Sequence, residues 1–182
     1  MVICIYIPGV RTDQRSYARL RREIEDCTAS GEDAANCVYL RGVVREGLRL
    51  SWANPTRLPR RVPSGGWKFK DYSFPADTSV GISAFQLHQN PTVFPEPQKF
   101  IPERWADPTD AMLTNFFAFG KGTRTCIAQS LATVELTQAT LKAAQADVLR
   151  GAKVVQDRIE IKEWFNSRVD GEKILIQFPP SP

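Results

Sequence analysis

The chain has 182 residues, of which 42% are hydrophobic and 24% are charged, and its formal net charge is +4 at pH 7. This length suits one domain that can bury a core, and this composition excludes an intrinsically disordered chain. The mild positive excess is compatible with an anionic partner, such as nucleic acid, anionic lipid or an acidic protein. Thirteen prolines, many of them between residues 55 and 108, predict long irregular connections.

An apolar stretch, MVICIYIP, occupies residues 1–8. It is too short to span a bilayer, for which a helix needs roughly 20 residues. It also lacks the basic flank and the cleavage site of a signal peptide. We therefore expect no membrane anchor in this chain.

The first third of the chain predicts two helices. Apolar residues recur at helical spacing over residues 13–28 and again over residues 36–50, where Asn36 is the candidate N-cap. The second helix must end before Pro55, because the residue before a proline disfavours the helical conformation. Basic residues gather at 15–22, which is typical of a solvated helix face, so we expect no nucleic-acid partner.

Short strands and loops follow in the middle of the chain. Strands are expected near residues 56–62, 66–70 and 78–82, between proline and glycine residues that would end them. Residues 83–89 predict a short helix. Residues 90–118 predict a meandering loop with few regular elements.

The last third of the chain predicts a long helix and a hairpin. Residues 129–148 are rich in Ala, Leu and Gln and predict the longest helix. Alternating residues over 153–162 and 173–178 predict the two strands of a terminal hairpin. Together these segments indicate a mainly α fold with small β-sheets.

The four cysteines do not form a recognisable metal or disulfide framework. No Cys-x-x-Cys pair occurs, and the chain has a single histidine, so the spacing of a zinc site is absent. The single histidine also weakens the hypothesis of a Ser-His-Asp catalytic triad. We expect Cys4, Cys27 and Cys37 to be inert packing thiols in an intracellular, reducing compartment.

The fourth cysteine, Cys126, stands in an unusual setting. Residues 119–128, FGKGTRTCIA, form a glycine-rich loop directly before the predicted long helix. A thiol at a helix N-terminus meets unpaired backbone N–H groups and the positive end of the helix dipole, which favour the thiolate. Gly122 is expected to supply a left-handed turn, and a loop made thin by glycine lets a large flat ligand approach the backbone. An axial thiolate ligand of haem iron needs this chemistry.

This loop resembles the haem-binding loop of the cytochrome P-450 monooxygenases, whose pattern is Phe-x-x-Gly-x-Arg-x-Cys-x-Gly. Phe119, Gly122, Arg124 and Cys126 fall on that pattern, whereas Ala128 stands where glycine is usual. The departure adds one methyl group where the following helix would pack against the porphyrin.

Two further motifs lie upstream in the order that this family has. Residues 43–50, VVREGLRL, carry Glu46 and Arg49 as Glu-x-x-Arg, and residues 100–105, FIPERW, are similar to the family's Pro-Glu-Arg-aromatic segment. The segments LPRRVP at 58–63 and HQNPTVFPEP at 88–97 also match family patterns.

The resemblance runs from about Arg15 to Gln177 but corresponds only to the C-terminal part of the family fold, well under half of it. It implies one partial haem domain over residues 1–182. Its parts would be the Glu-x-x-Arg helix (36–50), the meander (90–118), the Cys loop (119–128), the following helix (129–148) and the terminal hairpin (153–178).

The resemblance implies haem b as the cofactor, with the Cys126 thiolate as the axial ligand of the iron. Arg124 would pair with one haem propionate through its fork of N–H donors, and Phe119 would shield the sulfur from water. Either Arg60 or Arg61 would meet the other propionate, and Arg60 follows Leu-Pro as in the family's fungal members. Ordinary structural roles are the alternatives: a buried thiol, a solvated arginine and a core phenylalanine.

His88 has two interpretations: it could also touch a propionate, or it could be a loop histidine without a function. Glu46 and Arg49 lie three residues apart and share one helix face, where an exposed ion pair is worth under about 1 kcal/mol. The resemblance adds Arg104 and implies a buried Glu-Arg-Arg cluster, in which losing one partner costs about 3–5 kcal/mol. Such a cluster would serve folding and haem retention rather than chemistry.

The resemblance implies a haem-thiolate monooxygenase that inserts one oxygen atom from O2 into an apolar small molecule. Electrons would come from an NADPH-dependent reductase that docks near the Cys loop. The segments Trp52–Leu58 and Trp164–Val169 would face the substrate, with core packing as their alternative. The similarity to fungal members suggests secondary metabolism, by analogy alone. Family members are often found at the endoplasmic reticulum membrane.

The family's distal helix, which handles oxygen and protons, has no counterpart in this sequence. We therefore identify no catalytic residue and expect the chain to be truncated. The alternatives are a non-catalytic module that binds haem or another protein, and a decayed fragment without a function. An exposed apolar face would favour partner binding or aggregation.

Overall fold

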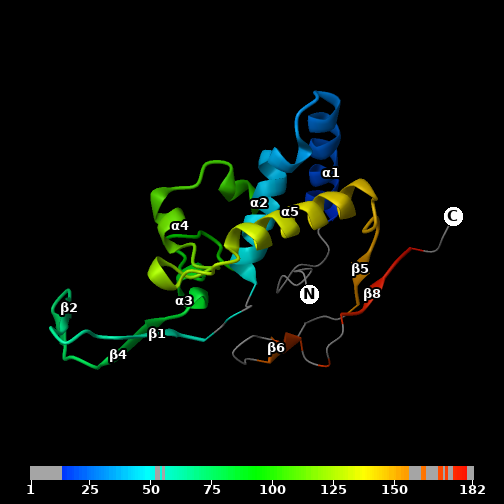
Figure 1. Cartoon of the computed structure of the whole chain (residues 1–182). Helices are drawn as coiled ribbons and strands as arrows, with labels where there is room; N and C mark the ends of the chain where they lie inside the picture. The colour runs from blue at the N-terminus through cyan, green and yellow to red at the C-terminus, as the bar shows by residue number, and fades with distance from the viewer. Residues whose placement is uncertain are drawn as a thin grey trace.

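The computed structural model describes residues 14–51, 54, 56–155, 161–162, 168–169, 171 and 174–179. Helices pack together in the body of the molecule, and small two-stranded antiparallel sheets lie at its edges (Figure 1). This arrangement confirms the mainly α fold with small β-sheets. Residues 1–13, which include Cys4, lie outside the described residues, as do Trp52 and most of 163–170, so the predictions for them stay predictions.

Three helices build the main core: α1 (Gln14–Ala29), α2 (Val38–Leu50) and α5 (Gln129–Gln145). The apolar face of α1 is buried against the other two helices, as its helical spacing predicts. The yellow helix α5 crosses the cyan helix α2 in Figure 1. The core side chains shared by the three helices are Leu20, Ile24, Tyr39, Leu40, Leu141 and Ala144.

The start of α2 differs from the expectation that Asn36 caps it. Asn36 is the last residue of a 3-10 turn, η1 (Ala34–Asn36), which is capped by the Asp33 side chain. The first N–H groups of α2 are instead satisfied from α1, because the Glu23 carboxylate accepts from the N–H groups of Tyr39 and Leu40 at 2.9 and 3.1 Å. A partner so far away in sequence leaves no local capping signal.

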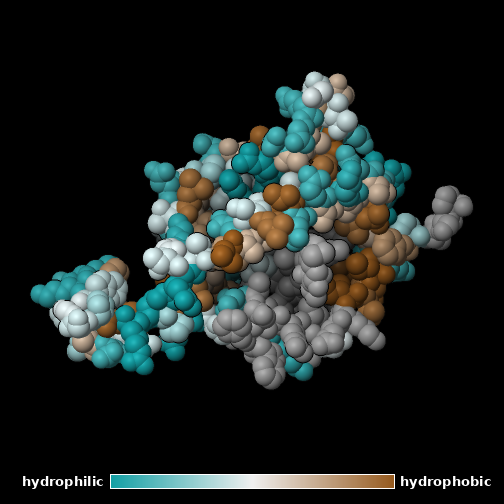
Figure 2. Space-filling model, in the orientation of Figure 1, coloured by the Kyte–Doolittle hydropathy of each residue, from teal (hydrophilic) through white to brown (hydrophobic). Residues whose placement is uncertain are grey.

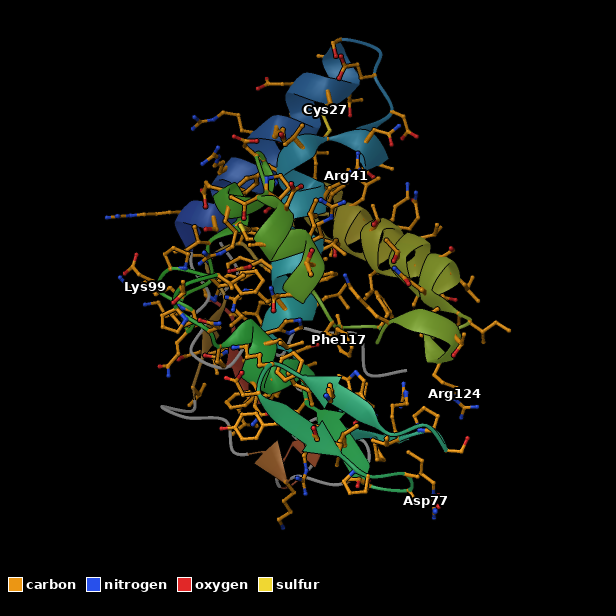
Figure 3. The ribbon with its side chains drawn as sticks, turned by 90° about the vertical axis from the view of Figure 1, so that its left-hand side faces the viewer. Cys27, Arg41, Asp77, Lys99, Phe117 and Arg124 are labelled. Atoms are coloured by element: carbon orange, nitrogen blue, oxygen red, sulfur yellow. A yellow bond between two sulfur atoms is a disulfide. The ribbon has the colours of Figure 1, made fainter. Side chains whose placement is uncertain are left out.

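Cys27 and Cys37 are joined by a disulfide between the last turns of α1 and the start of α2 (Figure 3). The expectation that both are free packing thiols is therefore wrong. The turn at Gly31, whose φ is 80°, reverses the chain between the two helices and brings the Cα atoms within 6.7 Å.

The middle of the chain forms two strand pairs that extend away from the helices (Figure 1). Strand β1 (Leu58–Arg61) pairs antiparallel with β4 (Ser79–Ile82), and between them β2 (Trp67–Phe69) pairs with β3 (Tyr72–Phe74). Strand β3 was not expected. The left-handed residue Lys70, with φ at 52°, makes a tight turn that lets β3 fold back on β2.

A short helix and the meander follow the strands. Helix α3 (Ala84–His88) starts with a capping box between Ser83 and Gln86, as expected for residues 83–89. The meander is more regular than expected, since it holds a 3-10 turn, η2 (Pro102–Trp105), and helix α4 (Asp110–Asn115). The Thr109 side chain caps α4, and a second apolar cluster of Phe94, Trp105 and Met112 fixes the meander.

The C-terminal segment forms two further antiparallel pairs. Strand β5 (Lys153–Val154) pairs with β8 (Ile176–Gln177), within the two strands expected for the terminal hairpin. Strand β6 (Ile161–Lys162) pairs with β7 (Arg168–Val169), so residues 153–162 are not one continuous partner of 173–178. None of the described helices combines the length and the apolarity needed to cross a membrane.

Candidate functional site

The Cys loop, residues 119–128, leads from the meander into α5 and is closed by its own backbone. The Cys126 N–H donates to the Phe119 carbonyl at 2.8 Å, and the Thr125 N–H donates to the Gly122 carbonyl at 3.1 Å. Gly120 and Gly122 have φ values of 68° and 73°, so Gly122 adopts the left-handed turn that its position in the motif predicts.

Cys126 is a free and exposed cysteine at the start of α5. Ala128 is the N-cap of that helix and offers no side-chain cap, and the N–H of Gln129, the first residue of α5, donates to the Cys126 carbonyl at 3.2 Å. A thiol there is open to a large ligand on its outer side. Residues 121–130 are all exposed, which includes Ala128 and Arg124.

Arg124 points away from the body of the molecule (Figure 3). Its guanidinium makes no hydrogen bond or ion pair with any residue that the structure describes. Phe119, at the other end of the loop, is half-buried beside α5. The Cys loop therefore presents a free thiol and an uncommitted cation on one exposed segment, with an aromatic ring behind it.

Strand β1 approaches the Cys loop from below in the view of Figure 3 and carries the two alternative arginines. The Leu58 side chain comes within 3.7 Å of where a Gly120 Cβ would lie. Successive side chains of a strand alternate between faces, so Arg60 shares the face of Leu58, and Arg61 lies on the other. Arg61 is 3.3 Å from Asp77 in an exposed ion pair.

The structure brings Glu46, Arg49 and Arg104 together in one buried cluster, which we call the Glu46 cluster. The Arg49 Nε and Nη2 atoms donate to the two Glu46 oxygens at 2.9 and 2.8 Å, and the Arg104 Nε donates at 3.1 Å. Glu46 and Arg49 have 0% and 1% of their surface exposed, so this is no surface ion pair. The cluster links α2 to η2.

The Glu46 carboxylate has further donors that hold its charge. The Ile101 N–H donates to it at 3.0 Å and the Trp105 indole N–H at 2.8 Å. Burial alone would raise the pKa of Glu46, but the hydrogen bonds and charges from Arg49, Ile101 and Arg104 outweigh it and hold the pKa below its ordinary value. Glu46 is therefore ionised at neutral pH.

Arg49 also fixes the backbone of the chain beyond α3. Its Nη1 donates to the carbonyls of His88 and Pro97 at 2.9 and 2.7 Å, and its Nη2 donates to the Lys99 carbonyl at 3.2 Å. The guanidinium also lies over the Phe94 ring, 5.3 Å from its centre. One buried side chain thus holds the end of α3 and the meander at residues 97–99.

His88 is not a loop histidine but a buried residue at the end of α3, with 1% of its surface exposed. Its Nδ1 lies 2.8 Å from the Arg49 carbonyl, and its Nε2 accepts from the Phe117 N–H at 2.8 Å. Both ring nitrogens are thus used by the protein, and the ring has no donor left for a propionate. The structure contradicts the interpretation of His88 as a propionate contact, because burial and backbone partners remove the ring from the surface.

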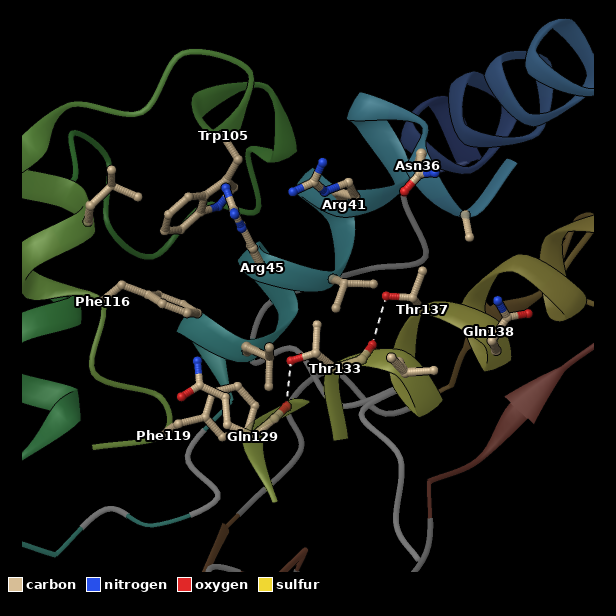
Figure 4. Close-up of a pocket in the computed structure, with 15 residues that line it drawn as sticks. Asn36, Arg41, Arg45, Trp105, Phe116, Phe119, Gln129, Thr133, Thr137 and Gln138 are labelled. Carbon is tan, nitrogen blue, oxygen red and sulfur yellow. Dashed lines mark hydrogen bonds between the residues drawn. The ribbon is translucent and has the colours of Figure 1, made fainter. Parts of the chain in front are cut away.

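A groove of about 370 Å3 lies between α2 and α5, next to the start of the Cys loop. Arg41 and Arg45 line it from α2, and Phe116 and Phe119 close one end (Figure 4). Burial lowers the pKa of Arg45, and the neighbouring charge of Arg41 lowers it further. The groove therefore concentrates positive charge beside an aromatic wall, which suits an anionic partner.

Two contributions to this site have only weak signals in the sequence. Trp105 belongs to the Pro-Glu-Arg-aromatic segment, but nothing in that motif shows that its indole N–H binds Glu46. The link from His88 to Phe117 joins residues 29 positions apart. The sequence shows that His88 is the single histidine of the chain, but it does not show that the His88 ring binds the Phe117 N–H.

The residues of the Cys loop fit a haem group. A single exposed thiolate can occupy one axial position of an iron whose other ligands come from a porphyrin. Among the described residues, no three His, Cys, Asp or Glu side chains converge to hold a metal by themselves. The open Arg124 beside the thiol provides a cation for a carboxylate-bearing ligand.

Comparison with known proteins gives a family for this arrangement. The family model described as Cytochrome P-450 matches residues 10–143. Cytochrome P-450 monooxygenase mfmF of Annulohypoxylon moriforme is 40% identical over 161 residues, which cover 84% of this chain and 33% of that protein. Cytochrome P-450 monooxygenase tndB of Aspergillus flavipes is 38% identical over 133 residues, 69% of this chain and 27% of that protein. The chain spans about a third or less of the length of these relatives.

Proposed function

Because the chain belongs to the cytochrome P-450 family, we propose that it provides the thiolate-bearing part of a haem-thiolate monooxygenase. The observation that carries this proposal is the free, exposed Cys126 in a closed glycine loop at the start of α5. Its thiolate would be the ligand that this chain provides to the haem iron, and the positive end of the α5 dipole would favour the negative charge on the sulfur. Phe119 limits the access of water to the sulfur.

The propionates of the haem are held by Arg124 and Arg60. Arg124 has no partner among the described residues, and a charge-assisted hydrogen bond to a carboxylate would satisfy it. Arg60 lies on the face of β1 that approaches Gly120, whereas Arg61 is already paired with Asp77 on the other face. We therefore assign the second propionate to Arg60 and not to Arg61.

The Glu46 cluster keeps the meander and the Cys loop in place around the cofactor. It connects α2 to η2 through Arg104 and to the meander carbonyls through Arg49. Because its charges are mutually satisfied in the interior, the cluster acts as one rigid unit. Its role is structural support and haem retention, and it takes no part in the chemistry.

The bound haem supplies the redox chemistry by which one oxygen atom of O2 enters an apolar small molecule. The relatives are named monooxygenases, and their fungal origin supports a substrate of secondary metabolism. Of the two segments expected to face a substrate, Trp52–Leu58 is described only in part, and Trp164–Val169 lies almost wholly outside the described residues. The substrate is therefore assigned by chemical class alone, as apolar.

The groove between α2 and α5 suits the docking of the reductase. Arg41 and Arg45 bring two positive charges to a surface next to Phe119 and the Cys loop (Figure 4). An acidic partner there would approach the thiolate side of the haem, and salt would weaken its binding. We propose an NADPH-dependent reductase as this partner.

A second candidate function is a non-catalytic module that binds another protein. The observation in its favour is the exposed apolar surface of α5 and of the loop before it: Leu131 and Val134 on α5 are 61% and 57% exposed, and Ile127 in the loop is 103% exposed. Stable folding and protein binding without haem would support this alternative.

Haem titration of the purified chain tests the proposed function. Wild type should take up one haem per chain, followed by the Soret absorbance, and Cys126→Ser should shift the ferric Soret band. Cys37→Ser is the matched control, because Cys37 is bound to Cys27 away from the loop. A Soret band that is the same in wild type and in Cys126→Ser would contradict the assignment of the ligand.

A further inference from the structure

His88 occupies a position where its protonation state can be read from its partners. The Arg49 carbonyl only accepts hydrogen bonds, so Nδ1, 2.8 Å away, must carry the proton. The Phe117 N–H only donates, so Nε2, also 2.8 Å away, must offer a lone pair. The ring is therefore a neutral imidazole in the Nδ1–H tautomer.

The link between His88 and α2 is reciprocal. The ring of His88 donates to the Arg49 carbonyl, while the Arg49 guanidinium donates to the His88 carbonyl at 2.9 Å. The ring stacks on Phe116 with centroids 5.7 Å apart and meets Phe94 edge-on at 6.1 Å. These contacts allow the His88 ring only one orientation, in which Nε2 points toward the backbone N–H of Phe117.

Phe117 stands where the chain leaves α4 for the Cys loop (Figure 3). Its N–H is held by His88, and its carbonyl accepts from the Gly120 N–H at 3.0 Å. Two residues further on, the Phe119 carbonyl accepts from the Cys126 N–H at 2.8 Å. A short series of backbone hydrogen bonds thus runs from His88 to the residue that bears the thiol.

We propose that His88 is a positioning residue that, as a neutral imidazole, ties the end of α2 to the Phe117 N–H and thereby sets the placement of the Cys126 loop. This inference rests on the proposed function, since placement of the loop matters because Cys126 ligates iron. His88 acts only through the Phe117 backbone, and it touches neither the cofactor nor a substrate.

The surroundings of the ring keep it neutral. Burial, the main cause, and the charge of Arg49 lower the pKa of His88, the hydrogen bond to the Arg49 carbonyl and the charge of Glu46 raise it, and the net result is a pKa of about 4. The charged groups acting on it come from α2, whereas the segments that carry Phe94 and Phe116 face it with aromatic rings. A second proton on Nε2 would set one donor against the Phe117 N–H and break the link.

Three substitutions separate the two ring nitrogens. His88→Gln places an amide oxygen near the position of Nε2 and can still accept from Phe117. His88→Asn reaches only the position of Nδ1 and can still donate to the Arg49 carbonyl. His88→Phe keeps the ring packing and removes both links.

The first test is NMR of the whole, 15N-labelled chain without haem at pH 7. We expect the Nδ1–H tautomer in wild type, with Nε2 unprotonated. We also expect the Phe117 amide to exchange with solvent at least about tenfold faster in His88→Asn and His88→Phe than in wild type or His88→Gln, because a buried hydrogen bond is lost. The Nε2–H tautomer in wild type would overturn the proposal without any variant, and so would equal Phe117 exchange in His88→Asn and His88→Gln.

The second test uses the haem-loaded chain and the carbon monoxide difference spectrum of its reduced form. His88→Gln should retain most of the long-wavelength thiolate band, and His88→Asn should convert much of it to the shorter-wavelength band of a lost thiolate. Equal bands in wild type and all three variants would overturn the positioning role. If wild type lacks the thiolate band while the exchange pattern holds, the proposed function fails and the link from His88 to Phe117 stands.

Discussion

An arginine near the Cys loop is best placed to hold a haem propionate when its charge is not already paired with a carboxylate. Arg124→Ala and Arg60→Ala should each weaken haem binding about ten- to a hundredfold, because hydrogen bonds to charged groups contribute about 1.5–3 kcal/mol. Arg61→Ala is the matched control on the same strand and should leave the affinity unchanged, since Arg61 is paired with Asp77. Haem titration followed by the Soret absorbance measures the dissociation constant of haem for each of the three variants. Weaker haem binding by Arg61→Ala than by Arg60→Ala would assign the second propionate to Arg61 instead of Arg60.

The buried His88 makes the free energy of unfolding depend on pH. Its pKa is about 4 in the folded chain against an ordinary 6.5, so between these values the unfolded chain binds a proton that the folded chain does not. The contribution of His88 is complete above pH 6.5 and is lost as the pH falls toward 4, by at most about 1.4 kcal/mol per pH unit. Urea unfolding of wild type and His88→Gln between pH 4.5 and 7 measures it. A slope that is the same in both chains would show that His88 is not the titrating group.

At the level of elements, the Glu46 cluster joins α2 to η2. Glu46→Ala leaves the buried Arg49 and Arg104 without their anion and should lower the free energy of unfolding by about 3–5 kcal/mol. Glu103→Ala is the control, because Glu103 pairs with Arg19 at the surface, and its loss should cost under about 1 kcal/mol. Denaturant unfolding near neutral pH compares the two. Similar losses in both variants would contradict the buried character of the cluster.

The packing of η2 on α2 depends on Gly42. A Cβ at Gly42 would lie 2.6 Å from the Pro102 carbonyl oxygen, which is backbone and cannot move aside. Gly42→Ala should therefore destabilise the chain by about 1–3 kcal/mol. In the same helix nothing lies within 4 Å of a Gly47 Cβ, so Gly47→Ala should be neutral or stabilising by up to about 1 kcal/mol. Thermal unfolding of Gly42→Ala and Gly47→Ala measures the difference in stability. Equal shifts of the melting temperature in the two variants would contradict the close approach of Pro102 to Gly42.

Local signals in the sequence were sufficient for most elements. The helix over residues 13–28 and the long helix from residue 129 follow from spacing and composition, and a short helix was expected over residues 83–89. The true N-terminus of α2 did not follow, because the Glu23 carboxylate that satisfies it belongs to another helix. Strand β3 was missed because its pairing depends on the left-handed turn at Lys70. Helix α4 was missed because only six residues carry its pattern.

The candidate site likewise contains residues whose roles local sequence motifs predict and residues whose roles depend on the tertiary fold. The sequence motifs are enough to propose roles for Cys126, Arg124 and Gly122, because those roles depend on the local backbone of one loop. They favour Arg60 over Arg61 only through the Leu-Pro that precedes it, and the two faces of β1 support the same proposal. The sequence allowed His88 to be a propionate contact, because its burial and its backbone partners are products of the tertiary fold.

At the level of the whole molecule, α5 has an apolar side that the described residues do not cover. Figure 2 shows hydrophobic side chains gathered along this helix. Leu131 and Val134 are among the exposed hydrophobic residues of α5. Exposed apolar surface promotes association, so the double variant Leu131→Gln with Val134→Gln should reduce self-association of the isolated chain. Light scattering over a concentration series measures it. Lys142→Gln, an exposed substitution at the far end of α5, is the control. Equal self-association of the double variant and the control would show that the apolar side of α5 does not drive association.

The central claim is that Cys126 binds haem iron as a thiolate, and the carbon monoxide difference spectrum of the reduced, haem-loaded chain tests it most directly. Cys126→His is the comparison, because imidazole also binds iron and keeps the haem in place while it removes the thiolate. Thiolate ligation by Cys126 predicts a long-wavelength Soret band in wild type and a short-wavelength band in Cys126→His. A short-wavelength band in the folded wild-type chain, or a long-wavelength band that persists in Cys126→His, would contradict it.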